Sequence, residues 1–134
     1  MTGPDELPPV DATTAAWWQA TEERRLVLQR CPVCAAVQHP PRAVCTWCGA
    51  DEPVLVAASG AGVVDAWTVV RRAPAPGFRV PYVLARVRLE EGPLLLTTLE
   101  AQGPEGWRCG APVQVSWRAL DDGRQLPVFV PRGG

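Results

Sequence analysis

The chain has 134 residues, of which 47% are hydrophobic, and its formal net charge is −1 at pH 7. Fifteen Pro and twelve Gly interrupt regular structure too often for a helical bundle, so the composition favours short strands joined by turns. The sequence has no apolar run of about 18 residues, so we expect no membrane span. It also has no basic segment ahead of an early apolar stretch, so we expect no secretory signal. We therefore expect a cytoplasmic protein whose thiols stay reduced.

The first two segments are a tail and a helix. Residues 1–12 are rich in Pro and acidic side chains and predict a flexible tail. An N-terminal helix is predicted over 13–30, because most of this range lacks Gly and Pro and follows threonines that can cap it. Trp17 and Trp18 are adjacent, so they cannot both face the same core from a helix. The second surface that one of them needs is either the barrel of this chain or another protein.

A zinc ribbon is predicted over 31–53 from the cysteines of two Cys-x-x-Cys turns, which are Cys31, Cys34, Cys45 and Cys48. Each turn can aim two sulfurs at one point, and two such turns complete a tetrahedral Zn²⁺ site. Four sulfurs leave no open position for water, so the metal would be structural. An iron site of rubredoxin type is the alternative. Between the knuckles, the sequence has room for a short two-stranded excursion.

A five-stranded barrel is predicted over 54–131, where apolar and polar residues alternate between turn signals. Two of these signals, Glu90–Pro93 and Asp121–Gly123, predict hairpins. We expect a closed barrel of the OB type, with an SH3-like barrel as the alternative, and a protein that is mainly β. The predicted strands are 62–71, 80–89, 93–99, 113–119 and 125–130.

The sequence does not indicate a catalytic set. Cys109 is the remaining cysteine and His39 the only histidine. A nucleophilic cysteine needs a base, but we interpret Cys109 as a small buried residue and His39 as a solvated loop residue. We therefore predict no catalytic residues.

Arg86 and Arg88 alternate with apolar residues in the second barrel strand, so both point to the same face. Such a pair can hold phosphates of a ligand such as a CoA thioester, or acidic groups of a partner protein. A solvated strand face is the simpler explanation, because the alternation itself requires only that one face of the strand meets water.

Several segments, taken in order, resemble a known family: small proteins with a rubredoxin-like zinc ribbon followed by an OB-fold, which act beside thiolase-like, acyl-CoA-using enzymes. The resemblance covers about residues 15–131. Its pieces are Trp17-Trp18, the run from Leu28 to Cys34, Pro40-Pro41-Arg42, Cys45-Thr46-Trp47-Cys48-Gly49, 59–64, 67–70, 80–83, 91–97 and 126–131.

The resemblance implies a non-catalytic accessory subunit that binds a thiolase-like protein in a hetero-oligomer and supports its acyl-CoA chemistry, with the catalytic residues on the partner. Related assemblies include steroid side-chain aldolases and two-component thiolases. On this reading Trp17, Trp18, Arg86 and Arg88 contact the partner or an acyl-CoA. The alternative is a protein that binds single-stranded nucleic acid, since ribbons and OB-folds both do so. The absence of Lys and a net charge near −3 with four thiolates and Zn²⁺ disfavour that alternative.

Overall fold

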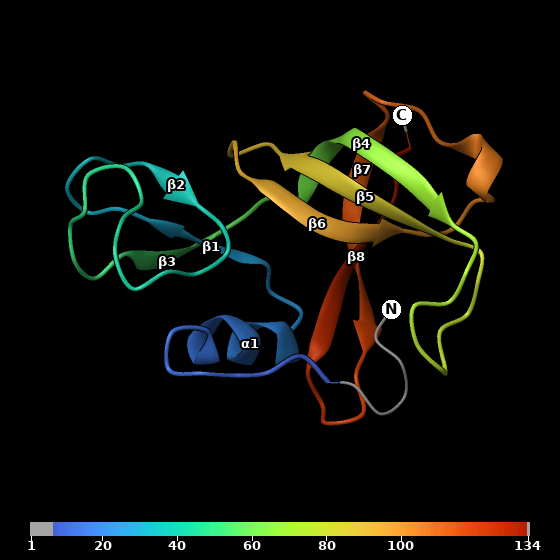
Figure 1. Ribbon diagram of the computed structural model, residues 1–134. Helices are drawn as coiled ribbons and strands as arrows, with labels where there is room; N and C mark the ends of the chain where they lie inside the picture. Colours follow the sequence, from blue (N-terminus) through green and yellow to red (C-terminus); the bar gives the residue numbers. More distant parts are fainter. Residues whose placement is uncertain (1–6, 134) are drawn as a thin grey trace.

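The computed structural model describes residues 7–133, and it divides into a ribbon at one end and a barrel at the other (Figure 1). A three-stranded antiparallel sheet forms the ribbon, with the strand order β2-β1-β3. The bounds of these strands are Val27–Arg30 for β1, Val37–Gln38 for β2 and Val54–Ala57 for β3. The helix α1 (Ala15–Glu22) lies below the ribbon and beside the lower end of the barrel in the view of Figure 1.

Five strands close into a barrel in the order β4-β5-β6-β8-β7. All five predicted strands and both hairpins are confirmed to within two residues. The observed strands are β4 (Ala61–Val70), β5 (Tyr82–Leu89), β6 (Leu94–Leu99), β7 (Pro112–Ala119) and β8 (Gln125–Pro131), with a short 3-10 helix, η1 (Pro104–Gly106), before β7.

Closure of the barrel depends on two pairings between strands that are distant in sequence. β4 pairs antiparallel with β7, and β6 pairs with β8 in parallel. The inward side chains of all five strands then share one core, in which Val87, Val113 and Phe129 have no exposed surface. The predicted fold, mainly β with an N-terminal helix, a ribbon and a closed five-stranded barrel, is confirmed.

The helix predicted over 13–30 is too long. α1 ends at Glu22, and Arg24 then adopts a left-handed backbone conformation with φ of 57°. Residues 27–30 instead form β1, which pairs with β3 along its whole length. This pairing buries Leu28 completely, a gain that a solvent-facing last helical turn could not provide.

The segment between the two Cys-x-x-Cys turns also differs from its prediction. It contributes one short strand, β2, which pairs with β1 instead of forming a two-stranded excursion of its own. The tail predicted over 1–12 lies partly outside the described residues. Within them, Leu7 and Pro8 line hollows on the barrel surface. None of the helices in residues 7–133 is long and apolar enough to cross a membrane.

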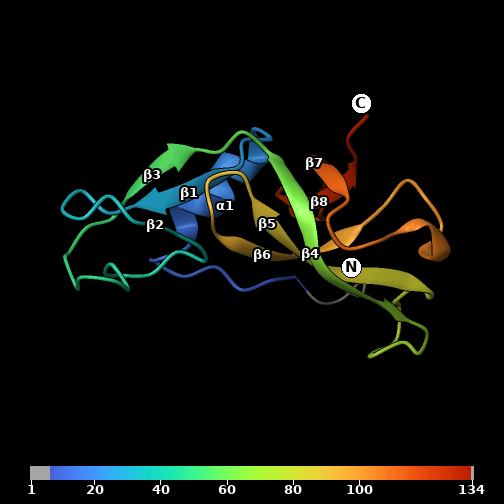
Figure 2. The same cartoon turned by 90° about the horizontal axis from the view of Figure 1, so that it is seen from above.

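Seen from above, the loop between β4 and β5 projects at the opposite end of the molecule from the ribbon (Figure 2). The stacked rings of Phe78 and Tyr82, 6.1 Å apart, lie at the base of this loop. The cysteine turns and this loop are therefore the two extremes of an elongated molecule.

Candidate metal centre and partner-facing surface

The four predicted ligands come together in the ribbon. The Sγ atoms of Cys31 and Cys48 are 3.6 Å apart, as are those of Cys34 and Cys45. All four sulfurs lie within 4.8 Å of one another. A tetrahedral site with Zn–S bonds of about 2.3 Å needs sulfurs about 3.8 Å apart. The four cysteines therefore form a zinc-ribbon site that fits a structural Zn²⁺, whose chemistry is to cross-link the two turns.

The two turns have the same backbone geometry. In the first, the N–H of Cys31 donates to the carbonyl of Ala36 at 2.9 Å, and the N–H of Ala35 donates to the carbonyl of Cys31 at 3.0 Å. The second turn repeats both bonds around Cys45, at 2.9 and 3.0 Å. Each turn also places the residue after its second cysteine in the left-handed region, with φ of 66° at Ala35 and 77° at Gly49.

The pKa of one cysteine in each turn is lowered, because backbone amides donate hydrogen bonds to its sulfur. The N–H groups of Cys34 and Val33 donate to the Sγ of Cys31 and lower its pKa to about 6, and the N–H of Cys48 lowers the pKa of Cys45. At Cys48 a backbone amide also favours the thiolate, but the sulfur of Cys31 and burial outweigh it and raise the pKa to about 12. Metal binding must displace the protons that remain, so it strengthens as pH rises.

Two buried glutamines connect the cysteine turns to the ribbon sheet, and the sequence analysis did not identify them. Gln38 donates from Nε2 to Oε1 of Gln29 at 2.8 Å and accepts from the N–H of Thr46 at 2.9 Å. Gln29 accepts from the N–H of Arg42 at 2.8 Å. This network holds the second turn, with its two cysteines, on β1 and β2. The only sequence signal was the position of Gln29 in an apolar run before Cys31.

Trp17 and Trp18 are buried within this chain, with 7% and 9% of their surfaces exposed. Their rings meet edge to face at 4.8 Å, and the Nε1 of Trp17 donates to the carbonyl of Val27 at 3.0 Å. This chain itself therefore buries both tryptophans, and no other protein is needed to cover them. A direct contact of either residue with a partner stays a prediction.

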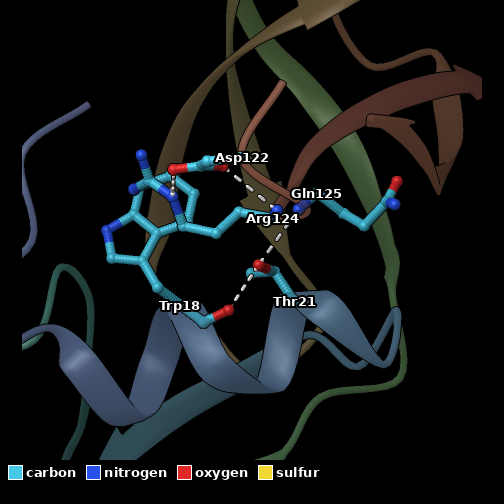
Figure 3. A network of polar contacts seen from close by, with 5 residues as sticks. All are labelled: Trp18, Thr21, Asp122, Arg124 and Gln125. Atoms are coloured by element: carbon cyan, nitrogen blue, oxygen red, sulfur yellow. Dashed lines mark hydrogen bonds and ion pairs between the residues drawn. The ribbon is translucent and has the colours of Figure 1, made fainter. Parts of the chain in front are cut away.

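A polar network attaches α1 to the β7–β8 hairpin (Figure 3). The Arg124 guanidinium lies 4.5 Å from the Trp18 ring centroid and donates from Nε to Oδ2 of Asp122 at 2.6 Å. Thr21 donates from Oγ1 to the carbonyl of Trp18 at 2.6 Å and accepts from the N–H of Gln125 at 3.3 Å. Arg124 thus gives Trp18 much of its cover, and no local pattern in the sequence indicated this.

Both expectations for the remaining cysteine and the histidine are wrong. Cys109 is exposed, because it lies in the turn between η1 and β7 and not in a core strand. His39 is half-buried, with its ring centroid 5.5 Å from that of Trp17. Burial lowers the pKa of His39 to about 4, so its ring is neutral at pH 7. The two residues lie in different parts of the fold.

Arg86 and Arg88 lie side by side on the outer face of the barrel, and Asp65 joins them. Arg86 donates from Nε to Oδ2 of Asp65 at 2.8 Å, and Nη2 of Arg88 lies 3.7 Å from Oδ1. Asp65 is the residue at which the β4–β5 register shifts. Leu96, directly opposite Arg86 on β6, is 72% exposed. We call Asp65, Arg86, Arg88 and Leu96 the arginine face.

A closed four-sulfur site on a ribbon, followed by a closed five-stranded barrel, defines a zinc-ribbon protein with an OB-type barrel. Family models match both parts. The "ChsH2, rubredoxin-like zinc ribbon domain" matches residues 18–54, and the "ChsH2, C-terminal OB-fold domain" matches residues 55–118. The chain therefore belongs to the ChsH2 family.

Two curated relatives differ in how much of their length the chain spans. A probable enoyl-CoA hydratase alpha subunit of Thermomonospora curvata is 40% identical over 124 residues, which are 92% of this chain and 39% of that protein. The chain thus spans about two fifths of that relative's length. A DUF35 domain-containing scaffold protein of Pyrococcus furiosus is 36% identical over 106 residues, which are 78% of this chain and 76% of that protein.

Solved structures show the same fold. A chain of the Ltp2-ChsH2(DUF35) aldolase is 39% identical, with a TM-score of 0.86 over 93% of this chain and 98% of that one. A DUF35-family protein of unknown function from Sulfolobus solfataricus has a TM-score of 0.65 over 92% of this chain, at 15% identity, which shows the fold alone.

Proposed function

We propose that this chain is a non-catalytic accessory subunit that binds a thiolase-like enzyme and supports its acyl-CoA chemistry. That chemistry would be thiolysis or retro-aldol cleavage of a CoA thioester, as in steroid side-chain degradation. The observation that carries the proposal is the likeness, over nearly the whole of both chains, to a chain of the Ltp2-ChsH2(DUF35) aldolase. Two relatives named as hydratase alpha subunits, one for 3-oxo-4,17-pregnadiene-20-carboxyl-CoA in Mycobacterium tuberculosis, add support for CoA thioesters as the ligand class.

The chemistry of the chain's own residues supports the non-catalytic role. Four sulfurs fill the coordination sphere of the zinc site, so the metal has no open position at which to activate water. Cys109 is exposed, but His39, the only histidine in the sequence, packs against Trp17 in another part of the fold. The general base that a cysteine nucleophile requires therefore has no candidate histidine at Cys109.

The arginine face is our proposed contact surface for the thiolase-like partner. Leu96, on β6 opposite Arg86, supplies an exposed apolar side chain, and Arg86 and Arg88 retain donors that Asp65 does not occupy. An apolar side chain beside guanidinium groups suits a partner surface that presents carboxylates next to an apolar recess. If CoA binds there instead, the same guanidinium groups would hold its phosphates.

Affinity purification of the tagged chain from its native host tests the proposal. We expect a thiolase-like subunit to co-elute in a fixed ratio, and the complex to cleave a CoA thioester that the isolated chain leaves intact. Cleavage by the rigorously purified chain, lost in the Cys109→Ala variant, would contradict the proposal. A salt-resistant nanomolar complex with single-stranded DNA or RNA would instead favour the nucleic-acid alternative.

A further inference from the structure

The strand β3 is an outer strand of the ribbon sheet, in which the order is β2-β1-β3. Across residues 7–133 it pairs with β1 alone, so its other edge has no partner strand there. Figure 2 shows β3 at the outer margin of the ribbon. An unpaired edge presents backbone N–H and C=O groups with which a further strand can pair. An extended segment can therefore join the sheet at β3.

The pairing with β1 decides which backbone groups of β3 point away from the sheet. The N–H of Ala58 donates to the carbonyl of Leu26 at 2.9 Å, just beyond the paired residues of the two strands. Inward and outward groups alternate along an antiparallel pair, so Val56 also bonds to β1. The residues between these positions, Leu55 and Ala57, therefore direct their N–H and C=O groups outward.

The row of free outward N–H groups ends on either side of Leu55 and Ala57. Pro53, just before β3, has no N–H, and the N–H of Ser59 already donates to Oε2 of Glu91 at 2.8 Å. Both Leu55 and Ala57 are exposed. We call the backbone N–H and C=O groups of these two residues the β3 edge.

Acidic side chains lie at both ends of the β3 edge. Asp51 and Glu52 come shortly before β3. Just after β3, Ser59 donates from Oγ to Glu90 at 3.0 Å and from its N–H to Glu91. Within residues 7–133, none of these four carboxylates forms an ion pair with an arginine. Both ends of the β3 edge therefore have negative charge available to a basic partner.

This pattern of charge favours one kind of incoming strand. If β3 paired antiparallel with β3 of a second copy, the acids before one strand would meet those after the other, which is unfavourable. An edge that is merely protected from pairing often carries charges or Pro within its strand, but Val54–Ala57 is wholly apolar. A segment with an apolar middle and basic ends is complementary to both the strand and its flanks.

We propose that the β3 edge adds one strand from another protein, an extended segment with apolar residues in its middle and Lys or Arg at both ends. Its backbone bonds to the N–H and C=O groups of Leu55 and Ala57, and its basic ends lie beside the acidic flanks. The inference goes beyond the proposed function, because β3 shares no residue with the arginine face. It holds whether or not a thiolase-like subunit binds there.

An NMR titration of the ¹⁵N-labelled, zinc-loaded chain with the peptide acetyl-KKVTVTVKK-amide tests the proposal. We expect saturable binding with a Kd of about 0.3 mM, a weak affinity that suits a short flexible peptide. The amides of Leu55 and Ala57 should gain protection from hydrogen exchange on binding. The amide of Val56 should keep its protection unchanged, because it already bonds to β1.

Two altered peptides separate strand addition from attraction between charges and leave the protein unchanged. Replacement of the four Lys by Glu should weaken binding at least about tenfold, because like charges then meet at both ends. N-methylation of the five central residues keeps the charge but removes the donors of both peptide edges, and it should also weaken binding at least about tenfold.

Variants of the chain test the same contacts. Ala57→Pro removes one outward N–H, a change that edge strands tolerate, and should weaken binding at least about fivefold. Asp51→Asn combined with Glu52→Gln should weaken it about three- to tenfold. Glu105→Gln combined with Asp121→Asn, the same change of charge at exposed barrel residues, is the control and should leave the affinity unchanged.

Three results would each overturn the proposal. The first is a lack of new protection at Leu55 and Ala57 when the peptide is saturating. The second is equal affinity for the original peptide and either altered peptide, a comparison that stands even if Ala57→Pro fails to fold. The third is protection of both amides without peptide that grows with protein concentration, because the occupant would then be a second copy of this chain.

Discussion

At the scale of single residues, the two cysteine turns differ in how well their sequence suits a shared backbone shape. Both place one residue in the left-handed region, but this residue is Gly in the second turn and Ala in the first. A side chain in that region costs about 1–2 kcal/mol, because its Cβ approaches a carbonyl oxygen. The first turn therefore carries strain that the second avoids.

We predict that Ala35→Gly stabilises the zinc-loaded protein by about 0.5–1 kcal/mol, since the relief of strain exceeds the added entropy of the unfolded chain. Gly49→Ala is the matched control and should destabilise by about 1 kcal/mol. A Cβ at Gly49 would meet no atom within 4 Å, so its effect would come from the backbone alone. Thermal unfolding at fixed zinc concentration measures both, and a lower Tm for Ala35→Gly would contradict the prediction.

The carboxylate of Asp122 should make folding sensitive to acid. Burial raises its pKa, but the backbone N–H and the guanidinium of Arg124 outweigh this and lower the pKa below its usual value. A carboxyl group whose pKa is lowered on folding stabilises the protein above its unfolded pKa of about 3.9, and this stabilisation is lost as pH falls through the folded pKa.

We therefore predict that Asp122→Asn lowers the Tm at pH 6 and reduces the further fall of the Tm below about pH 4. Asp121→Asn, the same change at the adjacent exposed residue, is the control and should retain the acid sensitivity of the wild type. Equal pH profiles for wild type and Asp122→Asn, measured by thermal unfolding, would rule out this role.

At the scale of elements, polar side chains as well as the cysteine cluster hold the ribbon together. Its sheet has short strands, and Val54 and Leu55 of β3 are exposed, so apolar burial is limited. The hydrogen bonds between Gln29 and Gln38 join the second cysteine turn to β1 and β2. They orient the ligand-bearing turn in the way that groups around a metal site commonly do.

We predict that the wild-type chain binds one zinc ion and that Gln38→Leu weakens its zinc affinity about 10- to 100-fold, because the Thr46 N–H loses its acceptor. Competition with a chelator measures this affinity. Gln19→Leu makes the same change at an exposed helix position and should leave zinc binding intact. An unchanged affinity in a folded Gln38→Leu protein would show that the network plays no part in metal binding.

At the scale of the whole molecule, α1 fixes how the ribbon and barrel meet. Trp17 donates to the carbonyl of Val27 at the start of the ribbon, while Trp18 packs under Arg124 of the barrel hairpin. One helix therefore contacts both parts through adjacent side chains. The arginine face lies on the barrel alone, so a partner can bind there without separating these contacts.

We predict that Arg86→Ala combined with Arg88→Ala separates the two uses of the arginine face. If the guanidinium groups bind acids of the partner, the double variant should weaken the complex, and if they hold CoA phosphates, it should raise the KM of an intact complex. Analytical ultracentrifugation and steady-state kinetics measure these two effects. Arg132→Ala, at an exposed position after β8, is the control. Normal assembly and normal KM in the double variant would exclude the face from both roles.

The sequence by itself determined the cysteine quartet, the five barrel strands and the two hairpins. The physical reason is that these features are local: a Cys-x-x-Cys turn, a period of two and a Gly at a tight turn act over a few residues. The alternation in β5 likewise placed Arg86 and Arg88 on one face without reference to the rest of the chain.

Only the tertiary structure decided where the helix ends, how the Trp pair is covered and which groups surround the zinc site. Leu28 joins a strand because β3 lies beside it, and Arg124 covers Trp18 because barrel closure brings the hairpin to α1. The hydrogen bond from Gln125 to Thr21 spans 104 residues. Such contacts depend on the packing of the complete chain, and no short segment of the sequence contains that information.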